Sequence, residues 1–253
     1  MSRPSSKDAI YATPLADIGG FVFDSKVADV FPDMLERSVP GYHSVIAQSG
    51  LLAEKFALDH TCCYDLGCSL GATLLAMRHA IEDRPCRLIG VDNSEAMIDR
   101  CIKLLDEDGA AAKAGGIELA PVELYCDDIC NVQFDTTSVV AMNYTLQFVA
   151  PGARADLLSQ IAAATVPGGA LILSEKIAFE DPVLNELYID RYHAFKRTNG
   201  YSELEVSQKR NALENVLIPD TLEAHQQRLL NVGYRRCSVW FQCFNFVSLI
   251  AIQ

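Results

Sequence analysis

The stretch Tyr64–Leu74, which reads YDLGCSLGATL, constrains the fold of this chain more than any other. A short apolar run enters it, and a helical pattern of apolar residues leaves it. A strand, a glycine-containing turn and a helix in this order open the βαβ unit of nucleotide-binding α/β proteins. Gly67 permits a sharp turn, and Gly71 permits close packing of the helix on the strand. Backbone N–H groups at the helix start would then face a ligand beyond the strand.

The same turn has a second interpretation, because residues 67–71 spell G-x-S-x-G, the nucleophile elbow of serine hydrolases. Ser69 would be the nucleophile. However, no His-Gly-Gly stretch for an oxyanion hole precedes the turn. The next predicted strand also ends at Asp92, about 20 residues past the turn, where a ribose-binding acid is expected. These observations favour a nucleotide-type site, with the hydrolase as an alternative.

The amino-acid composition limits the kinds of molecule that this chain is expected to bind. The chain has 253 residues, half of them hydrophobic, and a formal net charge of −12. Such acidity disfavours nonspecific binding to nucleic acid or to an anionic membrane. No apolar stretch is long enough to span a bilayer, and residues 1–10 lack the apolar core of a signal peptide. We therefore expect a cytoplasmic protein whose ligand is a small molecule or a protein partner.

The nine cysteines are not arranged for metal binding or for disulfides. No C-x-x-C pair exists, and most of the cysteines lie within apolar runs. Reduced, mostly buried thiols in a reducing compartment are the expected state. Because paired ligand spacings are missing, no metal site is predicted.

Strands and helices alternate through most of the chain. The predicted strands are 62–66, 87–91, 121–125, 139–142 and 170–174, and the helices are 72–81, a helix capped by Ser94, 154–165 and 221–231. Residues 108–116 and 167–169 are predicted as a loop and a turn, and 234–241 and 244–252 as a closing antiparallel hairpin. Before the alternation come a loose lead-in over 1–20, helices over 24–31 and 41–56, and a turn over 37–42 between them.

Four of the predicted strands in succession lead into polar residues: Asp65, Asp92, Asp128 and Asn143. Ligands of open parallel sheets bind beyond the carboxyl ends of the strands. The four residues therefore predict a lined site at one edge of the sheet. Asp92 can accept hydrogen bonds from both ribose hydroxyls, since a carboxylate is a bidentate acceptor. If the ligand is S-adenosyl-L-methionine, Asp128 would lie beside its adenine, and Asn143 would lie near its sulfonium or its amino-acid part.

These features predict an α/β protein with the Rossmann-like fold of class I S-adenosyl-L-methionine (SAM)-dependent methyltransferases. The expected sheet has seven mostly parallel strands with an antiparallel C-terminal strand. The turn reads D-x-G-x-x-x-G, not the G-x-G-x-x-G of dinucleotide enzymes. We expect one SAM-binding domain over 1–253, with an N-terminal helical cap over about 20–60 and a helical insert over about 181–218. Cations of the insert, among them Lys196, Lys209 and Arg210, are by default a solvated face.

Several stretches outside the glycine turn resemble one family. They are Val30–Met34, Arg37–Tyr42, Tyr64–Gly71, Asn143–Phe148, Asn199–Glu205 and Trp240–Phe246. Over nearly the whole chain, from about Tyr11 onward, the sequence is similar to the bacterial carboxy-S-adenosyl-L-methionine synthases. The one departure is the small-residue stretch 108–116, which looks longer than usual and is expected to be a loop without effect on the chemistry.

The resemblance implies synthesis of carboxy-S-adenosyl-L-methionine from SAM and prephenate, with release of phenylpyruvate. The family's proposed route loses carbon dioxide from prephenate, and a sulfonium ylide captures it. A partner tRNA carboxymethyltransferase then uses the product at the wobble uridine, so direct tRNA binding is not expected. The family also implies a homodimer. The insert is a plausible interface, and Arg210 could serve its own subunit or the neighbouring one.

The resemblance also assigns residues. Arg210, with help from Tyr42, would hold the new carboxylate, a role that suits a bidentate guanidinium. The expected ligand-binding residues are Tyr42, Gly67, Cys68, Ser69, Asp92, Asn93, Asp128, Ile129, Asn143 and Arg210. No general base is evident, and His43 and His193 are each more typical of structural histidines. Two further alternatives remain at this point: a conventional SAM-dependent small-molecule methyltransferase, and a non-catalytic SAM-binding or scaffold protein.

Overall fold

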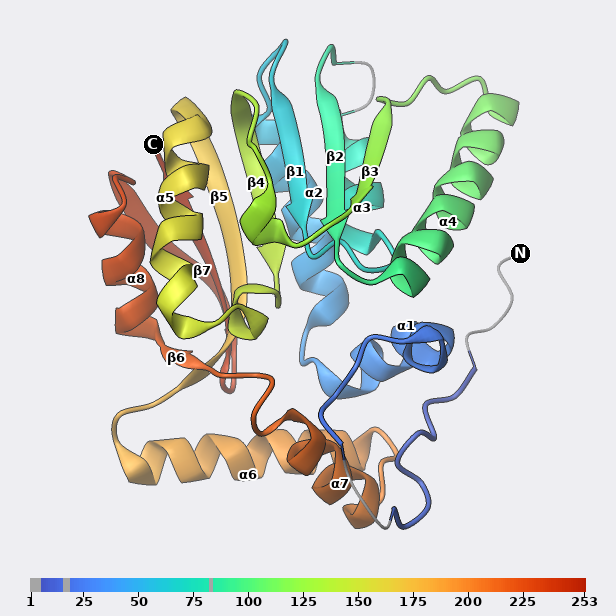
Figure 1. The fold of residues 1–253 in the computed structure, drawn as a ribbon, viewed down its shortest axis with the longest axis vertical. Coiled ribbons are helices and arrows are strands. Elements are labelled where there is room, and N and C mark those ends of the chain that lie inside the picture. The colour runs from blue at the N-terminus through green and yellow to red at the C-terminus, as the bar shows by residue number, and fades with distance from the viewer. Residues whose placement is uncertain (1–5, 16–18, 82–83) are drawn as a thin grey trace.

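The computed structural model describes residues 6–15, 19–81 and 84–253. One twisted sheet runs through the centre, with helices on both faces (Figure 1). The strand order is β3-β2-β1-β4-β5-β8-β7, and the two-residue strand β6 pairs with β5 off this path. The strands are β1 (Cys62–Leu66), β2 (Arg87–Asp92), β3 (Val122–Cys126), β4 (Thr137–Asn143), β5 (Thr165–Ala178), β6 (Asp220–Thr221), β7 (Arg236–Cys243) and β8 (Phe246–Ile252).

Helices cover the sheet and the edge at which its parallel strands end. They are α1 (Ser25–Ser38), α2 (Tyr42–Phe56), α3 (Ala72–Ile81), α4 (Glu95–Ala114), α5 (Arg154–Ala164), α6 (Pro182–Thr198), α7 (Glu203–Leu213) and α8 (Leu222–Asn231). One face of the sheet packs on α5 and α8, and the other packs on α2, α3 and α4. Helices α1, α6 and α7 lie beyond the carboxyl ends of the strands, in the lower part of Figure 1. Across the described ranges, no helix has the length and apolarity needed to cross a membrane.

The strand directions agree with the predicted architecture. Strands β1 to β5 are mutually parallel along the sheet, whereas β8 runs antiparallel to both β5 and β7. This confirms a mostly parallel sheet closed by an antiparallel C-terminal hairpin. Strand β6 is a short addition that the sequence pattern did not predict.

The glycine turn has the expected position between β1 and α3. Gly67, Ser69 and Gly71 all have positive φ, at 75°, 48° and 82°. A Cβ atom at Gly67 would lie 2.2 Å from Oγ1 of Thr145, so both the backbone conformation and the available space require glycine there. The turn is therefore closely packed against the segment that follows β4.

The predicted loop over 108–116 is wrong, because α4 continues through it to Ala114. Its small residues are mostly alanines, which are the strongest helix formers, and Ala112 is buried. Asp108 ties this part of the helix to α3 through Arg78 (3.1 Å) and His79 (2.7 Å). Gly116, with φ of 75°, follows the helix end.

Two predicted turns are also corrected. Residues 167–169 lie inside β5, where the register with β4 shifts, and Gly168 has φ of 84°. The helix predicted over 24–31 continues to Ser38, so the predicted turn at 37–42 is reduced to the residues between α1 and α2. Pro32 lies within α1 and cannot donate to the carbonyl of Ala28, but Arg100 of α4 donates to that carbonyl at 3.0 Å.

The lead-in predicted to be loose is partly anchored. Residues 1–5 and 16–18 lie outside the described residues, but Asp8 and Tyr11 are buried. Asp8 accepts a hydrogen bond from Tyr201 at 2.5 Å and faces Lys209 at 3.4 Å. Arg37 donates to the carbonyl of Asp8 and stacks on the ring of Tyr201. The N-terminal segment is thus bound to both α1 and α7.

Candidate active site

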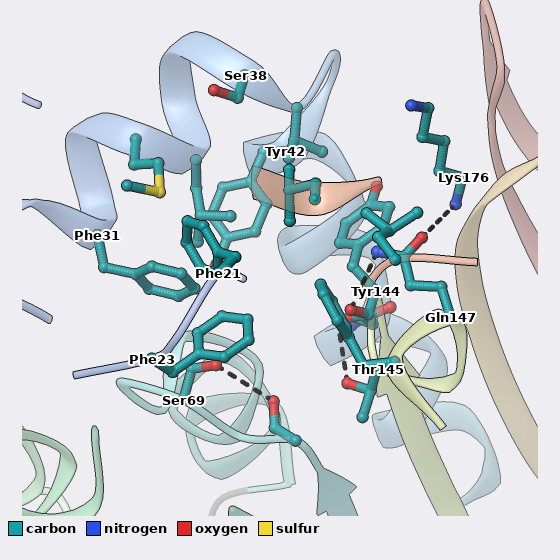
Figure 2. Close-up of a pocket in the computed structure, with 18 of the residues that line it drawn as sticks. Phe21, Phe23, Phe31, Ser38, Tyr42, Ser69, Tyr144, Thr145, Gln147 and Lys176 are labelled. Carbon is teal, nitrogen blue, oxygen red and sulfur yellow. Dashed lines mark hydrogen bonds between the residues drawn. The ribbon is translucent and has the colours of Figure 1, made fainter. Parts of the chain in front are cut away.

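A cavity of about 1440 Å³ lies beyond the carboxyl ends of the parallel strands. The sheet forms its floor, α1 and the start of α2 form one wall, and α6 and α7 form another. Figure 2 shows three aromatic rings, Phe21, Phe23 and Phe31, on one side, and Tyr144, Gln147 and Lys176 on the other. All ten residues that the sequence predicts for ligand binding line this cavity: Tyr42, Gly67, Cys68, Ser69, Asp92, Asn93, Asp128, Ile129, Asn143 and Arg210. Of the four strand-end residues, Asp65 is the exception, since it is buried and does not line the cavity.

Asp92, the last residue of β2, organises the nucleotide side of the cavity. One of its carboxylate oxygens accepts from the N–H of Ser69, and the other accepts from the N–H of Ser94, each at 2.9 Å. Burial raises the pKa of Asp92, and these N–H donors oppose the rise. Each carboxylate oxygen can accept a second hydrogen bond. Asp92 therefore fixes the glycine turn and keeps the capacity to accept a pair of hydroxyl donors.

The segment after β3 supplies one polar and one apolar group. Asp128 caps a short 3₁₀ helix by accepting from the N–H of Cys130 at 2.9 Å, and it is exposed. Its neighbour Ile129 is buried, although it lines the cavity. An apolar side chain beside an exposed carboxylate can bind a flat heteroaromatic ring with an amino substituent.

Asn143 at the end of β4 is held by hydrogen bonds at both ends of its amide. Nδ2 donates to Ser49 at 3.1 Å and to Thr73 at 3.0 Å, and Oδ1 accepts from Ser174 at 2.7 Å. This network joins α2, α3 and β5 through a single side chain. Asn143 lines the cavity, and its hydrogen bonds fix the floor of the cavity.

Tyr42 and Arg210 reach the cavity from opposite parts of the chain. Tyr42 opens α2, and burial raises the pKa of its phenol, so the hydroxyl stays protonated at neutral pH and can donate. Arg210 lies in the last turn of α7 and is exposed. It also lines a smaller cavity of about 320 Å³ against α6. An exposed guanidinium between two cavities is available to an anionic ligand.

Sequence reasoning missed a group of cations on the wall formed by β5, α6 and α7. Lys176, Lys196 and Lys209 line the cavity together with Arg210. The interpretation of the insert lysines as a solvated face is wrong for Lys196 and Lys209, which are 3% and 5% exposed. Lys176 carried a usable signal, because it comes shortly after the predicted strand 170–174, just as Asp92 comes at the end of the predicted strand 87–91.

The structure gives no support to a serine hydrolase. Ser69 has the positive φ of an elbow residue, but its hydroxyl donates to the carbonyl of Gly67, at 3.5 Å. In the described ranges, none of the hydrogen bonds of Ser69 involves a histidine. Those ranges also contain no cluster of three or more potential metal ligands.

Comparisons with known proteins agree with the fold. Residues 64–169 match the family model described as a methyltransferase domain. The human N-acetylserotonin methyltransferase, solved in complex with SAM, has a similar fold, with a TM-score of 0.56, 15% identity and coverage of 90% of this chain and 55% of that chain. The fold is therefore that of the class I SAM-dependent methyltransferases.

Curated relatives are much more similar and match at full length. The carboxy-S-adenosyl-L-methionine synthase of Aliivibrio fischeri (strain ATCC 700601 / ES114) is 51% identical over 249 residues, which cover 98% of this chain and 100% of the relative. The synthase of Trichlorobacter lovleyi is 52% identical over 246 residues, which cover 97% and 98%. With such identity over both whole chains, the protein belongs to the carboxy-S-adenosyl-L-methionine synthase family.

Proposed function

We propose that this protein is an enzyme that converts SAM and prephenate to carboxy-S-adenosyl-L-methionine, phenylpyruvate and water. The carboxylate lost from prephenate becomes bonded to the former methyl carbon of SAM. The proton that leaves that carbon combines with the departing hydroxyl of prephenate, so no external oxidant, reductant or metal is required. Because the departing hydroxyl of prephenate takes up this proton, the reaction can proceed without a dedicated protein base.

The observation that carries this proposal is the division of one cavity into two chemically different halves. Asp92 and Asp128 provide acceptors on the side of β2 and β3, as a nucleoside requires. Lys176, Lys196 and Arg210 provide positive charge on the side of β5, α6 and α7. A conventional methyl acceptor does not need that many cations, whereas a doubly carboxylated substrate and a carboxylated product do.

We assign roles to the ten lining residues on this basis. Asp92 and Asn93 bind the ribose, and Asp128 and Ile129 bind the adenine. Gly67, Cys68 and Ser69 pack against the methionine part, and Asn143 fixes the floor near the sulfonium. Arg210 binds the added carboxylate, and the protonated hydroxyl of Tyr42 donates to it. Because of its exposed position, Arg210 can act in its own subunit or reach a neighbouring one.

A homodimer is part of the proposal. Helix α6 exposes three apolar side chains near its start, Val183, Leu184 and Leu187, which are 73%, 43% and 48% exposed. Their spacing of three and four residues places them together along one side of the helix. An exposed apolar group of this kind supports the helical insert as the contact between two copies.

We further propose one SAM-binding domain with the N-terminal cap and the insert as its additions, working in the cytoplasm. All nine cysteines are free thiols, and five of them are buried, which suits a reducing compartment. The product would supply a partner tRNA carboxymethyltransferase that modifies the wobble uridine. The net charge of −12 favours leaving tRNA to that partner.

Mass spectrometry of the small molecule that co-purifies with the protein, with and without added prephenate, tests the proposal. We expect a bound species with the mass of SAM plus carbon dioxide, and phenylpyruvate in the solution. If prephenate leaves only SAM or its demethylated product, the alternative of a conventional small-molecule methyltransferase replaces the synthase. If no SAM-derived molecule binds at all, a scaffold role replaces both.

A further inference from the structure

Two lysines of the cavity wall share one aromatic ring. Nζ of Lys196 lies 4.5 Å from the ring centre of Tyr192, and Nζ of Lys176 lies 5.0 Å from the same centre. Lys196 and Tyr192 are on α6, whereas Lys176 is near the C-terminal end of β5. Two ammonium groups are thus gathered at one ring, although like charges repel.

Neither lysine has an anionic partner among the described residues. The ion pairs within 4.0 Å that the structure records in residues 6–15, 19–81 and 84–253 include neither Lys176 nor Lys196. Their neighbour Lys209 differs, since it faces Asp8 at 3.4 Å. Lys196 is nevertheless only 3% exposed. A buried ammonium without a carboxylate is costly unless a ligand supplies the missing charge.

The charged groups that shift the pKa values of these two lysines are mostly cations. Burial and the charge of Arg210 lower the pKa of Lys176 to about 8. Burial, with Lys209 and Lys176, lowers the pKa of Lys196, and Asp8 opposes this shift only in part. The pKa of His193 is lowered by burial and by the same group of cations. An anion placed among these groups would relieve their mutual repulsion.

The cation pair is set apart from the nucleoside end of the cavity. In the strand order β3-β2-β1-β4-β5, Lys176 belongs to a strand two positions from β1 and three from β2. Adjacent strands lie about 4.8 Å apart, so the backbone of β5 at Lys176 lies roughly 10 Å across the sheet from β1 and farther from β2, which ends in Asp92. A ligand group at Lys176 is therefore too far from β2 to contact the ribose-binding residues. The separation is large enough for a second, smaller ligand.

We propose that Lys176 and Lys196, held at the ring of Tyr192, form the carboxylate-binding subsite for the second substrate, separate from the contact that Arg210 makes with the carboxylated product. The subsite selects a dianion, because one carboxylate meets the lysine pair while the other is presented toward Arg210 and the sulfonium. The tyrosine ring holds both ammonium groups in place by cation–π attraction when no substrate is bound. This inference rests on the proposed function, whose second substrate it locates.

Calorimetric titration of prephenate into protein saturated with S-adenosylhomocysteine tests the subsite without turnover. S-adenosylhomocysteine lacks the methyl group that would react, so the titration measures prephenate binding without turnover. We expect K176M and K196M each to weaken prephenate binding about tenfold or more, as for the loss of a charge-assisted hydrogen bond. Affinity for S-adenosylhomocysteine should change by less than about twofold, since its contacts lie on other strands. K103M, on the exposed part of α4, is the matched control and should change neither affinity.

The outcomes separate this inference from the proposed function. Unchanged prephenate affinity in K176M and K196M overturns the subsite, even if the wild-type enzyme makes the carboxylated product. Weakened prephenate binding in both variants, with no wild-type turnover, retains the subsite and overturns the synthase. A fall in melting temperature with equal losses for both ligands shows a structural role for the lysines and overturns the subsite. Wild-type protein that binds no prephenate overturns both.

Discussion

The hydroxyl of Tyr201 donates a hydrogen bond of 2.5 Å to Oδ2 of Asp8, which precedes it by 193 residues. The same carboxylate faces Nζ of Lys209 at 3.4 Å, and Asp8 is 1% exposed. Lys209 is followed directly by Arg210 on α7. The N-terminal segment therefore holds in place the helix that carries the cation assigned to the product carboxylate.

We expect Asp8→Asn to destabilise the protein by about 3 kcal/mol, because it leaves the buried ammonium of Lys209 without its counter-charge. Tyr201→Phe is the matched variant, and it should cost only about 1 kcal/mol, since it removes one hydrogen bond and no charge. Urea unfolding of both variants measures the difference. Equal losses in the two variants would mean that the charge of Asp8 contributes nothing beyond its hydrogen bond.

Asp92→Ala should weaken SAM binding by about 1.5–3 kcal/mol, the usual worth of hydrogen bonds to a charged group. The variant also frees the N–H groups of Ser69 and Ser94, so the glycine turn loses its anchor. Isothermal titration with SAM measures the change. Asp127→Ala, an exposed carboxylate next to the cavity but not lining it, is the control, and a loss of similar size there would remove the special role of Asp92.

Arg210→Ala should reduce affinity for the carboxylated product by about 1.5–3 kcal/mol more than affinity for SAM, because only the product carries the extra carboxylate. Arg210→Lys should restore part of the difference, since an ammonium keeps the charge but not the bidentate geometry. Competition binding with both ligands provides the measurement. Equal losses for the two ligands would contradict the assignment of Arg210 to the carboxylate.

His225 makes the stability of the fold depend on pH. It is 1% exposed, and neither ring nitrogen has a hydrogen-bond partner in the described residues. Burial lowers its pKa from 6.5 to about 4. As the pH falls, His225 therefore takes up a proton in the unfolded state before it does so in the folded state. The free energy of unfolding is at its full value above pH 6.5 and decreases as the pH drops toward 4.

This loss should reach about 3 kcal/mol for the one residue, from the size of the shift. His225→Leu removes the titrating group and should flatten the stability curve between pH 6.5 and 4. Thermal unfolding over that range, compared with the wild type, tests the expectation. A curve as steep in the variant as in the wild type would assign the acid sensitivity to other groups.

The glycine turn and the strand ends were predictable because their signals are local. Strand β1 and helix α3 have the predicted bounds, and Ser94 caps α4 as expected by accepting from Met97 at 3.2 Å. In each case a few adjacent residues determine the backbone. The order of polar residues along successive strands predicted a site at the edge where the parallel strands end, and the cavity lies at that edge.

The rest depended on contacts that the linear pattern does not contain. The burial of Lys209 requires Asp8, and that of Lys196 requires the packing of α6 against α1 and α7. The alanines of 108–116 favour a helix locally, but the contacts of Asp108 with Arg78 and His79 that join this part of α4 to α3 cannot be read from the linear pattern. A charged residue in an insert is usually solvated, so only the assembled fold distinguishes these lysines from Arg191 and Arg197, which are exposed.

The position of β8 between β5 and β7 affects the order in which this chain can fold. Ala170–Lys176 of β5 pair with Phe246–Ile252 of β8, while α6, α7, β6, α8 and β7 are all made between them. During synthesis, the edge of β5 that pairs with β8 therefore stays unpaired until β8 has been made. An unpaired hydrophobic edge can join a neighbouring chain. The nascent protein is most exposed to aggregation in that interval, and a chain cut short before β8 would remain in it.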